Sequence, residues 1–326
     1  MATIKDIAKM ANVSIATVSR IMNGKGEASA ETIKRVNNII EELDYKPNKL
    51  AQSLSTKRSN LIAVVLPNLK NPFFGELATA IEKSAAKRGF RILLCNTNDN
   101  RDSVDYFLDM IADNFAFGAI ISSLQITADD LEGLEKKGIK TVTIDRAFFS
   151  HPYSAININQ FQGAYMATEH LIEKKAEEIL FISGPKDDPL SIERKRGYLK
   201  CLRNHQKTFQ HIIYGDFSVE SGYNLVSKLF DSVLSFDAIF ASNDLMAIGA
   251  IRACKDYGKR IPEDIKIIGN DAISLGEYLE PRLTTISQER KLISDLLIEE
   301  LIFLHDKNGK PQKQNIEPKI VIRETT

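Results

Sequence analysis

The chain has 326 residues, of which 43% are hydrophobic, so it can form more than one core and is too apolar to be disordered throughout. Its 43 Lys and Arg residues balance 43 Asp and Glu residues. No stretch approaches the roughly 18 consecutive apolar residues of a membrane helix. The first ten residues, MATIKDIAKM, carry charges where a signal peptide would be apolar. We therefore expect a soluble, cytoplasmic protein with more than one domain.

Cysteine, histidine and glycine patterns argue against several classes of site. The three cysteines have no CxxC spacing, and the five histidines have no HExxH or paired spacing. Neither a disulfide framework nor a zinc site is indicated. GxGxxG, GxSxG and P-loop motifs are also missing from the sequence. We expect no metal, no cofactor and no enzymatic activity.

The charges are distributed unevenly along the chain. Residues 1–58 contain ten Lys and Arg residues against six Asp and Glu residues, which leaves 33 basic and 37 acidic residues for 59–326. A basic segment before a mildly acidic remainder favours a polyanionic partner. An ordinary solvated helix face is the alternative explanation.

Residues 1–46 have the pattern of three short helices. Thr3 and Asp6 have the spacing of a helix start, and a helical apolar pattern follows to about residue 11. Ser14 can cap a second helix that Asn23 and Gly24 would end, and Ser29 can cap a third. This order predicts a helix-turn-helix with a supporting helix. A three-helix cap that does not touch DNA is the alternative.

The outward face of the second helix favours DNA. A helix in the major groove needs small apolar groups for thymine methyls, hydroxyls for phosphates and a guanidinium for guanine. The face predicted to point outward carries these groups: Ile15, Ala16, Thr17, Ser19 and Arg20. An ordinary solvated face would contain more Lys and Glu.

The segment 3–24, TIKDIAKMANVSIATVSRIMNG, closely resembles the DNA-binding headpiece of the LacI family of bacterial transcription regulators. The resemblance implies that Ile15, Ala16 and Arg20 read bases, and we also expect Asn23 to contact DNA. It further implies a hinge helix over about Asn48–Ser55, ordered only on operator DNA. In that helix Leu54 would wedge into a minor-groove base step. The DNA contacts expected from this segment are Asn48, Leu54 and Lys57. An exposed linker leucine is the alternative for position 54.

Beyond residue 60, short apolar runs alternate with amphipathic segments. The runs begin near residues 61, 91, 118 and 140, and the alternation resumes with runs near 178, 211, 237 and 265. This order predicts an α/β protein with two doubly wound parallel-sheet lobes, and the resemblance implies lobes of the periplasmic-binding-protein type. We divide the chain into a headpiece (1–46), a hinge helix and linker (47–60) and an effector and dimerisation domain (61–326). The expected N-lobe is about 61–160 and 289–315, and the expected C-lobe is about 161–287 and 317–326.

Polar and aromatic residues follow the predicted strands, where ligands of such sheets bind. Carboxylates, amides and guanidinium groups can bind vicinal hydroxyls, and aromatic rings can cover the C–H face of a sugar. The candidate effector-binding residues are Asn71, Phe73, Phe74, Asp145, Arg146, Arg194, Phe217, Asn243, Asp271 and Gln288. Taken singly, each could instead be a cap, an ion pair or a core residue.

The same ten positions resemble the ribose-contacting pattern of periplasmic ribose-binding protein: an NPFF run, a DR pair, an Arg before Gly-Tyr, a Phe, an Asn-Asp, an Asp and a Gln. The resemblance implies a repressor of a ribose utilisation operon. Asn270 departs from it, because an aromatic residue usually precedes this Asp. Another sugar, a sugar phosphate, a purine or a phosphocarrier protein therefore stays open as the signal.

We expect a homodimer whose headpieces bind the half-sites of a pseudo-palindromic operator and which sugar binding releases from DNA. The resemblance does not give the sign of the effect, and induction is expected for a catabolic operon. A cytosolic sugar-binding module without DNA contact is the alternative from another class.

Overall fold

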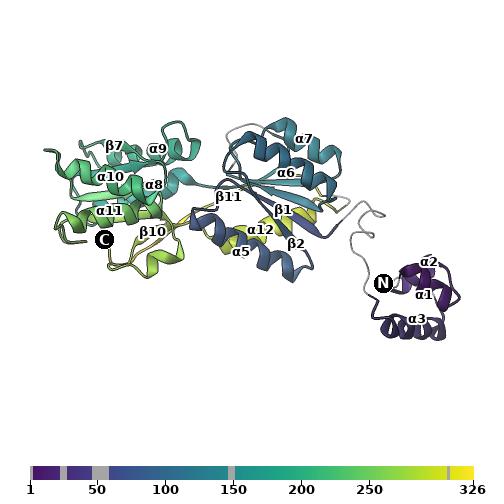
Figure 1. The fold of residues 1–326 in the computed structure, drawn as a ribbon. Coiled ribbons are helices and arrows are strands. Elements are labelled where there is room, and N and C mark those ends of the chain that lie inside the picture. The colour runs from purple at the N-terminus through teal and green to yellow at the C-terminus, as the bar shows by residue number, and fades with distance from the viewer. Residues whose placement is uncertain (1–2, 23–27, 46–58, 146–150, 307–308) are drawn as a thin grey trace. The chain divides into compact units, whose positions relative to one another are not determined.

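The computed structural model describes residues 3–22, 28–45, 59–145, 151–306 and 309–326 (Figure 1). The chain divides into two compact units, Met1–Ser59 and Asn60–Thr326. Within the described ranges, no helix combines the length and the apolar character needed to cross a membrane.

The first unit contains the three helices that the sequence predicts: α1 (Ile4–Met10), α2 (Ile15–Met22) and α3 (Ala30–Glu42). Each starts at a predicted cap. Thr3 and Asp6 form a reciprocal capping box, in which the Thr3 backbone N–H donates to Asp6 Oδ2 at 2.9 Å. Ser14 Oγ accepts from the backbone N–H of Thr17 at 3.0 Å, and Ser29 caps α3 in the same way. These bonds satisfy N–H groups that have no partner inside the helix.

One fully buried side chain from each helix meets in the core of this unit: Ile7, Val18 and Val36. Between α1 and α2 the chain turns at Asn12, whose φ is +52°. Asn adopts this left-handed conformation more readily than most residues. The tight turn brings α1 and α2 together over the small core.

The first sheet of the second unit is parallel throughout, in the order β11-β5-β4-β3-β1-β2. Its strands are β1 (Leu61–Leu66), β2 (Arg91–Asn96), β3 (Gly118–Ile121), β4 (Lys140–Ile144), β5 (Ser154–Ile158) and β11 (Lys313–Ile316). Helices cover both faces. One core lies under α5 (Pro72–Lys87) and α12 (Arg290–Phe303), and the other under α6 (Arg101–Asp113) and α7 (Ala128–Lys136). This layer arrangement is the N-lobe.

The second sheet has the order β12-β10-β9-β8-β6-β7. Its strands are β6 (Ile179–Ser183), β7 (His211–Tyr214), β8 (Ala238–Ala241), β9 (Lys266–Asp271), β10 (Thr284–Ser287) and β12 (Lys319–Val321). The covering helices are α8 (Gln160–Glu173) and α9 (Pro189–Asn204) on one face and α10 (Val219–Phe230) and α11 (Asp244–Asp256) on the other, with the short η1 (Ser274–Glu277) before β10. The predicted doubly wound α/β fold is confirmed. Strand β12, which the sequence did not predict, is added at one edge of this sheet and runs antiparallel to β10.

The chain passes between the two lobes three times. It crosses from β5 to α8, from β10 to α12, and from β11 to β12. Short connections of this kind allow one lobe to rotate against the other. They also place the first residues of α8 and α12 beside the carboxyl ends of the strands.

Candidate functional site

A cavity of about 470 Å³ lies at the carboxyl ends of the strands and is lined by both lobes. Nine of the ten candidate effector-binding residues line it: Asn71, Phe73, Phe74, Asp145, Arg194, Phe217, Asn243, Asp271 and Gln288. The tenth, Arg146, lies outside the described residues. A cavity of this size, with aromatic walls and a few converging polar groups, is typical of a small-molecule site.

The N-lobe supplies an amide and two aromatic rings from the start of α5. Asn71 caps this helix, because its Oδ1 accepts from the backbone N–H of Phe73 at 3.0 Å. The rings of Phe73 and Phe74 pack edge to face with centroids 5.3 Å apart. Phe73 also belongs to the N-lobe core and is only 7% exposed. Phe73 is therefore both a core residue of the N-lobe and a residue that lines the cavity.

Asp145 and Arg194 are joined through Gln160, which the sequence analysis did not single out. Asp145 Oδ2 accepts from Gln160 Nε2 at 3.0 Å, and Gln160 Oε1 accepts from Arg194 Nε at 2.9 Å. The other oxygen of Asp145 accepts from the backbone N–H of Ile158 at 2.7 Å. Arg194 also donates to the carbonyl of Ser242 at 2.5 Å. The alternative prediction for Arg194, an ion pair with Glu193 or Asp188, is wrong, because Arg194 donates to the Gln160 amide and the Ser242 carbonyl instead.

Asp271 is the most deeply enclosed carboxylate that faces the cavity. It is 4% exposed, and its Oδ1 accepts from Gln288 Nε2 at 2.6 Å and from Asn270 Nδ2 at 3.1 Å. Burial raises the pKa of Asp271, against the attraction of Arg194. Asn270 therefore supports the carboxylate from one side instead of covering the cavity as an aromatic ring would.

Asp244, the residue after Asn243, is fully buried behind the cavity. It accepts from Thr285 Oγ1 at 2.6 Å and from the backbone N–H of Ile273 at 2.8 Å. Burial and the nearby charge of Asp271 raise its pKa. Gly269 is required at this point, because an added Cβ would lie 2.2 Å from the Asp244 carboxylate.

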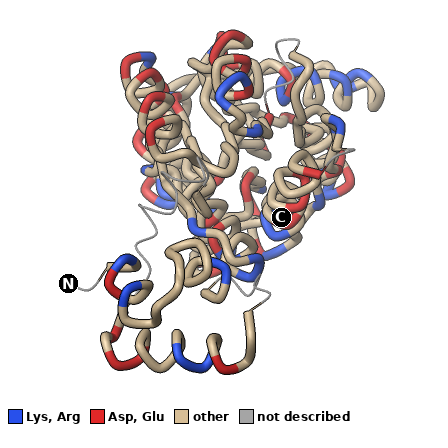
Figure 2. The backbone as a smooth tube through the Cα atoms, turned by 90° about the vertical axis from the view of Figure 1, so that its right-hand side faces the viewer, with Lys and Arg blue, Asp and Glu red and all other residues tan. Residues whose placement is uncertain are grey.

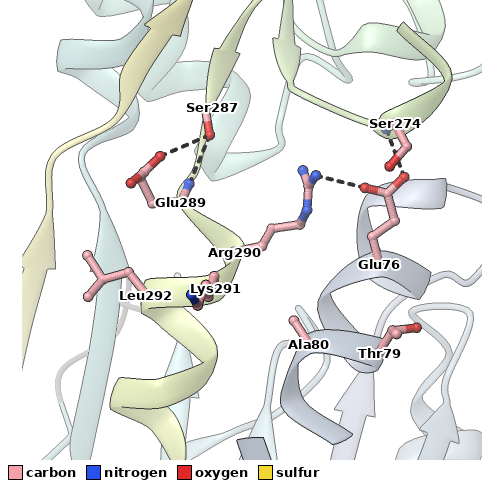
Figure 3. Close-up of a pocket in the computed structure, with 9 residues that line it drawn as sticks. All are labelled: Glu76, Thr79, Ala80, Ser274, Ser287, Glu289, Arg290, Lys291 and Leu292. Carbon is pink, nitrogen blue, oxygen red and sulfur yellow. Dashed lines mark hydrogen bonds and ion pairs between the residues drawn. The ribbon is translucent and has the colours of Figure 1, made fainter. Parts of the chain in front are cut away.

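Arg290 at the start of α12 pairs with Glu76 of α5, and Glu76 also contacts Ser274 (Figure 3). Arg290 donates to the carbonyls of Asp271 and Ala272 at 2.6 and 2.8 Å, and it pairs with Glu76 at 2.8 Å. Glu76 also accepts from the backbone N–H of Ser274 at 2.9 Å. Asp271 and Ala272 both have positive φ, a conformation that persists only where the surroundings enforce it. Sequence periodicity gave no signal for this arrangement.

On the C-lobe side, Asn243 and Phe217 are positioned together. Asn243 caps α11 through its Oδ1, as its alternative interpretation predicted, and its Nδ2 donates to the carbonyl of Phe217 at 2.9 Å. The ring of Phe217 lies against Gly184 at the end of β6. A Cβ on Gly184 would come within 2.1 Å of Phe217 Cζ, so only glycine fits there.

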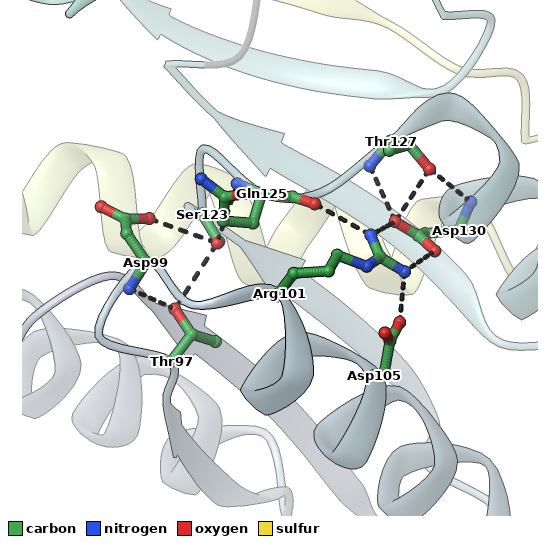
Figure 4. A network of polar contacts seen from close by, with 8 residues as sticks. All are labelled: Thr97, Asp99, Arg101, Asp105, Ser123, Gln125, Thr127 and Asp130. Carbon is green, nitrogen blue, oxygen red and sulfur yellow. Dashed lines mark hydrogen bonds and ion pairs between the residues drawn. The ribbon is translucent and has the colours of Figure 1, made fainter.

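The N-lobe rim of the cavity is fixed by a polar network (Figure 4). Asp99 lines the cavity, and its Oδ1 accepts from the backbone N–H of Leu124 at 3.0 Å and from Ser123 Oγ at 3.3 Å. Nearby, Arg101 pairs with Asp130 and Asp105. These contacts tie the loop after β2 to the loop after β3. Asp99 is thus a cavity residue that the sequence analysis missed.

The described lining of the cavity is acidic, with six aspartates (99, 145, 187, 188, 216 and 271) and one arginine, Arg194. Within the described ranges, no three His, Cys, Asp or Glu side chains are grouped so that they could hold a metal ion. An acidic, hydroxyl-accepting surface disfavours anionic ligands and suits hydrogen-bond donors.

In the first unit, α2 presents the face that the sequence predicts. Ile15, Ala16 and Arg20 are exposed, whereas Thr17 and Ser19 are half-buried. The hydroxyl of Thr17 lies 2.9 Å from that of Ser14, so it contributes to the helix cap. The other candidate DNA contacts lie outside the described residues: Asn23, Asn48, Leu54 and Lys57.

Charge alone does not mark a DNA-binding face on the three helices. Acidic and basic positions are interspersed along them (Figure 2), and the described residues up to 45 hold five Lys and Arg residues and five Asp and Glu residues. The positive excess of residues 1–58 therefore comes from segments 23–27 and 46–58, which carry five basic residues and one acidic residue.

Two domain families match the chain. Residues 3–48 match the family described as bacterial regulatory proteins of the lacI family, and residues 168–326 match a periplasmic binding protein-like domain. Among curated proteins, the chain is 35% identical to a ribose operon repressor of Halalkalibacterium halodurans, covering 100% of this chain and 97% of that protein. It is 33% identical to the transcriptional repressor PurR of Actinobacillus pleuropneumoniae, covering 99% and 98%.

Solved structures of LacI family regulators are also similar to the chain. The Lac repressor dimer bound to operator and an anti-inducer is 26% identical, with a TM-score of 0.89 and coverage of 99% of this chain and 98% of that one. A LacI family regulator from Enterococcus faecium with bound ribose is 28% identical, with a TM-score of 0.73 and coverage of 82% and 98%. The chain therefore belongs to the LacI family of bacterial regulatory proteins, which are DNA-binding transcriptional repressors.

Proposed function

We propose that this protein is the repressor of a ribose utilisation operon and that ribose binding in the cavity releases it from its operator. The observation that carries the proposal is the convergence of nine candidate residues from both lobes on one cavity. Their chemistry suits a small neutral sugar, because carboxylates and amides accept from hydroxyls while the phenylalanine rings cover C–H faces. The ribose operon repressor and the ribose-bound regulator among its relatives support the same ligand.

The charge of the cavity supports an unphosphorylated ligand. The charged residues of its described lining are six aspartates and one arginine. Two like charges 4 Å apart repel by about 4 kcal/mol at the effective dielectric constant of a protein surface. A sugar phosphate would therefore meet strong repulsion, whereas a neutral pentose would not.

The arrangement of the lobes supports a closing motion on ligand binding. Asp145 belongs to the N-lobe and Arg194 and Asp271 to the C-lobe, so a ligand that contacts all three favours a closed form. The three crossings can act as the hinge. We infer that closure changes the spacing of the hinge segments near residues 48–55 and thereby weakens DNA binding.

On the DNA side, we propose a homodimer that places one α2 in each half-site of a pseudo-palindromic operator, with Ile15, Ala16 and Arg20 reading bases. One short helix contacts too few bases to give specific affinity alone. The exposure of these three side chains and the operator-bound Lac repressor dimer among the structural neighbours support this arrangement. DNA contacts by four residues outside the described ranges stay predictions: Asn23, Asn48, Leu54 and Lys57.

The test combines calorimetry and DNA binding with the full-length protein. A duplex is first selected from random-sequence DNA by the protein itself. D-ribose, D-ribose 5-phosphate, D-fructose, sucrose and purine bases are then titrated with and without that duplex. We expect ribose to bind and to weaken DNA binding at least tenfold, and ribose 5-phosphate to bind poorly. Ribose binding that leaves DNA affinity unchanged would refute the proposed coupling, and binding of none of the sugars would refute the sugar effector.

The PurR-type relatives favour a second candidate, a repressor of the same family that responds to another small molecule. The titration with purine bases separates the ribose repressor from this second candidate. A planar base lacks the vicinal hydroxyls from which the aspartates would accept hydrogen bonds. Selection of a DNA duplex also tests the remaining alternative, a sugar-binding module without DNA contact.

A further inference from the structure

The most informative feature outside the candidate set is Gln160, the first residue of α8. It lies where the chain crosses from the N-lobe to the C-lobe, and it is 6% exposed. Its amide joins two charged residues that line the cavity from opposite lobes, Asp145 and Arg194.

The chemistry of the two partners fixes the orientation of the Gln160 amide. A carboxylate can only accept and a guanidinium can only donate, so Nε2 must face Asp145 and Oε1 must face Arg194. The distances are 3.0 Å and 2.9 Å. Both bonds involve a charged group, and such bonds are roughly twice as strong as neutral ones.

A neutral side chain between two opposite charges affects which of their hydrogen-bonding groups can face the cavity. Asp145 and Arg194 are both buried and carry opposite charges, so without a spacer they could pair directly. A direct pair would use the hydrogen-bonding groups that otherwise face the cavity. Gln160 instead satisfies one oxygen of Asp145 and the Nε of Arg194.

We propose that Gln160 is a positioning residue for the effector: it holds Asp145 of the N-lobe and Arg194 of the C-lobe in the orientations that bind the ligand and prevents their direct pairing. The proposal rests on the proposed function of the cavity. Gln160 itself is not among the residues that line the cavity, so its effect on the ligand is exerted through its two partners.

The first test compares Gln160→Met with Gln162→Met in the full-length protein. Methionine keeps the length and approximate volume of glutamine and removes both hydrogen bonds. Gln162 lies on the same helix and is half-buried, and its side chain has no hydrogen bond that the structure shows, which makes it a matched control. We expect Gln160→Met to weaken D-ribose binding by about ten- to a hundred-fold, the range for losing one or two charge-assisted bonds. The control should stay within about twofold. Equal affinities of the two variants would overturn the proposal.

The second test uses pH to separate positioning from packing. A protonated carboxyl in Gln160→Glu can donate to Asp145 and accept from Arg194 as the amide does, whereas the ionised form repels Asp145. Among the described residues, the charged groups beside this position are Asp145, Arg194 and Glu193, and Glu193 is paired with Arg196. We expect the ratio of variant to wild-type ribose dissociation constants to approach one near pH 5 and to rise to tenfold or more near pH 8. A ratio that does not change with pH would contradict the proposal.

Thermal unfolding without ligand tests the role of Gln160 independently of the proposed sugar effector. If wild-type protein binds no sugar, the ribose proposal fails, and thermal unfolding of Gln160→Glu and Gln160→Met still reports on the Asp145–Gln160–Arg194 bridge. Burial and the charge of Asp145 raise the pKa of the introduced carboxyl, and Arg194 offsets only part of this. The stability of the Gln160→Glu protein relative to wild type is therefore retained at low pH and lost as pH rises. We expect the difference in unfolding temperature from wild type to widen with pH for Gln160→Glu and to stay constant for Gln160→Met. Parallel curves for both variants would show that the bridge does not hold the charged pair.

Discussion

Asp271→Asn should stabilise the ligand-free protein while it impairs effector binding. Burial raises the pKa of Asp271 from an ordinary value of 3.8 to about 6. Each unit by which the folded pKa exceeds the unfolded one costs about 1.4 kcal/mol once the group is ionised. Ionised Asp271 therefore lowers the free energy of unfolding at neutral pH, by about 1 to 3 kcal/mol. An asparagine can still accept from Gln288 and Asn270 without this cost.

The sign of the pH dependence follows from the direction of the shift. A raised folded pKa gives stability that is complete below the unfolded pKa and is lost as pH rises through the folded pKa. Wild-type protein should therefore lose stability between about pH 4 and 6, and Asp271→Asn should not. The variant also removes the repulsion that raises the pKa of Asp244, which acts in the same direction.

The assay is urea unfolding of wild type and Asp271→Asn at several pH values, with ribose calorimetry on the same samples. We expect the variant to be more stable by about 1 to 3 kcal/mol at pH 7 and equal to wild type near pH 4. Ribose affinity should fall by about ten- to a hundred-fold, because a charged acceptor is replaced by a neutral one. A variant that is less stable than wild type at pH 7 would refute the argument that burial of this carboxylate opposes folding.

Three further substitutions test other parts of the molecule. Arg20→Ala should weaken binding to the selected DNA by about 1 to 3 kcal/mol and relax the preference at one base pair, and an unchanged selection profile would argue against base reading. Gly184→Ala should displace the Phe217 ring, lower the free energy of unfolding by about 1 to 3 kcal/mol and weaken ribose binding, whereas unchanged ribose affinity would show that this ring does not cover the ligand. Arg290→Met should remove the donors to the carbonyl of Asp271 and its neighbour and lower the free energy of unfolding by about 2 to 3 kcal/mol, as measured in urea, and a neutral effect would show that the strained backbone is held without this side chain.

The sequence predicted the central strands and the helix caps because each depends on neighbouring residues. Parallel strands that are buried on both faces need a continuous apolar run, and the run at 61–66 coincides with β1. The caps at Thr3, Ser14 and Ser29 were predictable for the same reason, since each bonds within three residues. The edge strands β11 and β12 gave no such run, because β11 holds Lys, Gln and Asn and β12 is only three residues long.

The sequence alone therefore determined the order of the central strands and of the helices between them, the family and a set of residues able to bind a sugar, because these depend on local patterns and on whole motifs. Only the tertiary structure decided which of these residues share a cavity, that Gln160 joins Asp145 to Arg194, and that Arg290 supports Asp271. The physical reason is that each of these contacts joins segments far apart in the chain. The chain crosses between the lobes three times, and hydrogen bonds formed at a crossing leave no periodicity in the sequence.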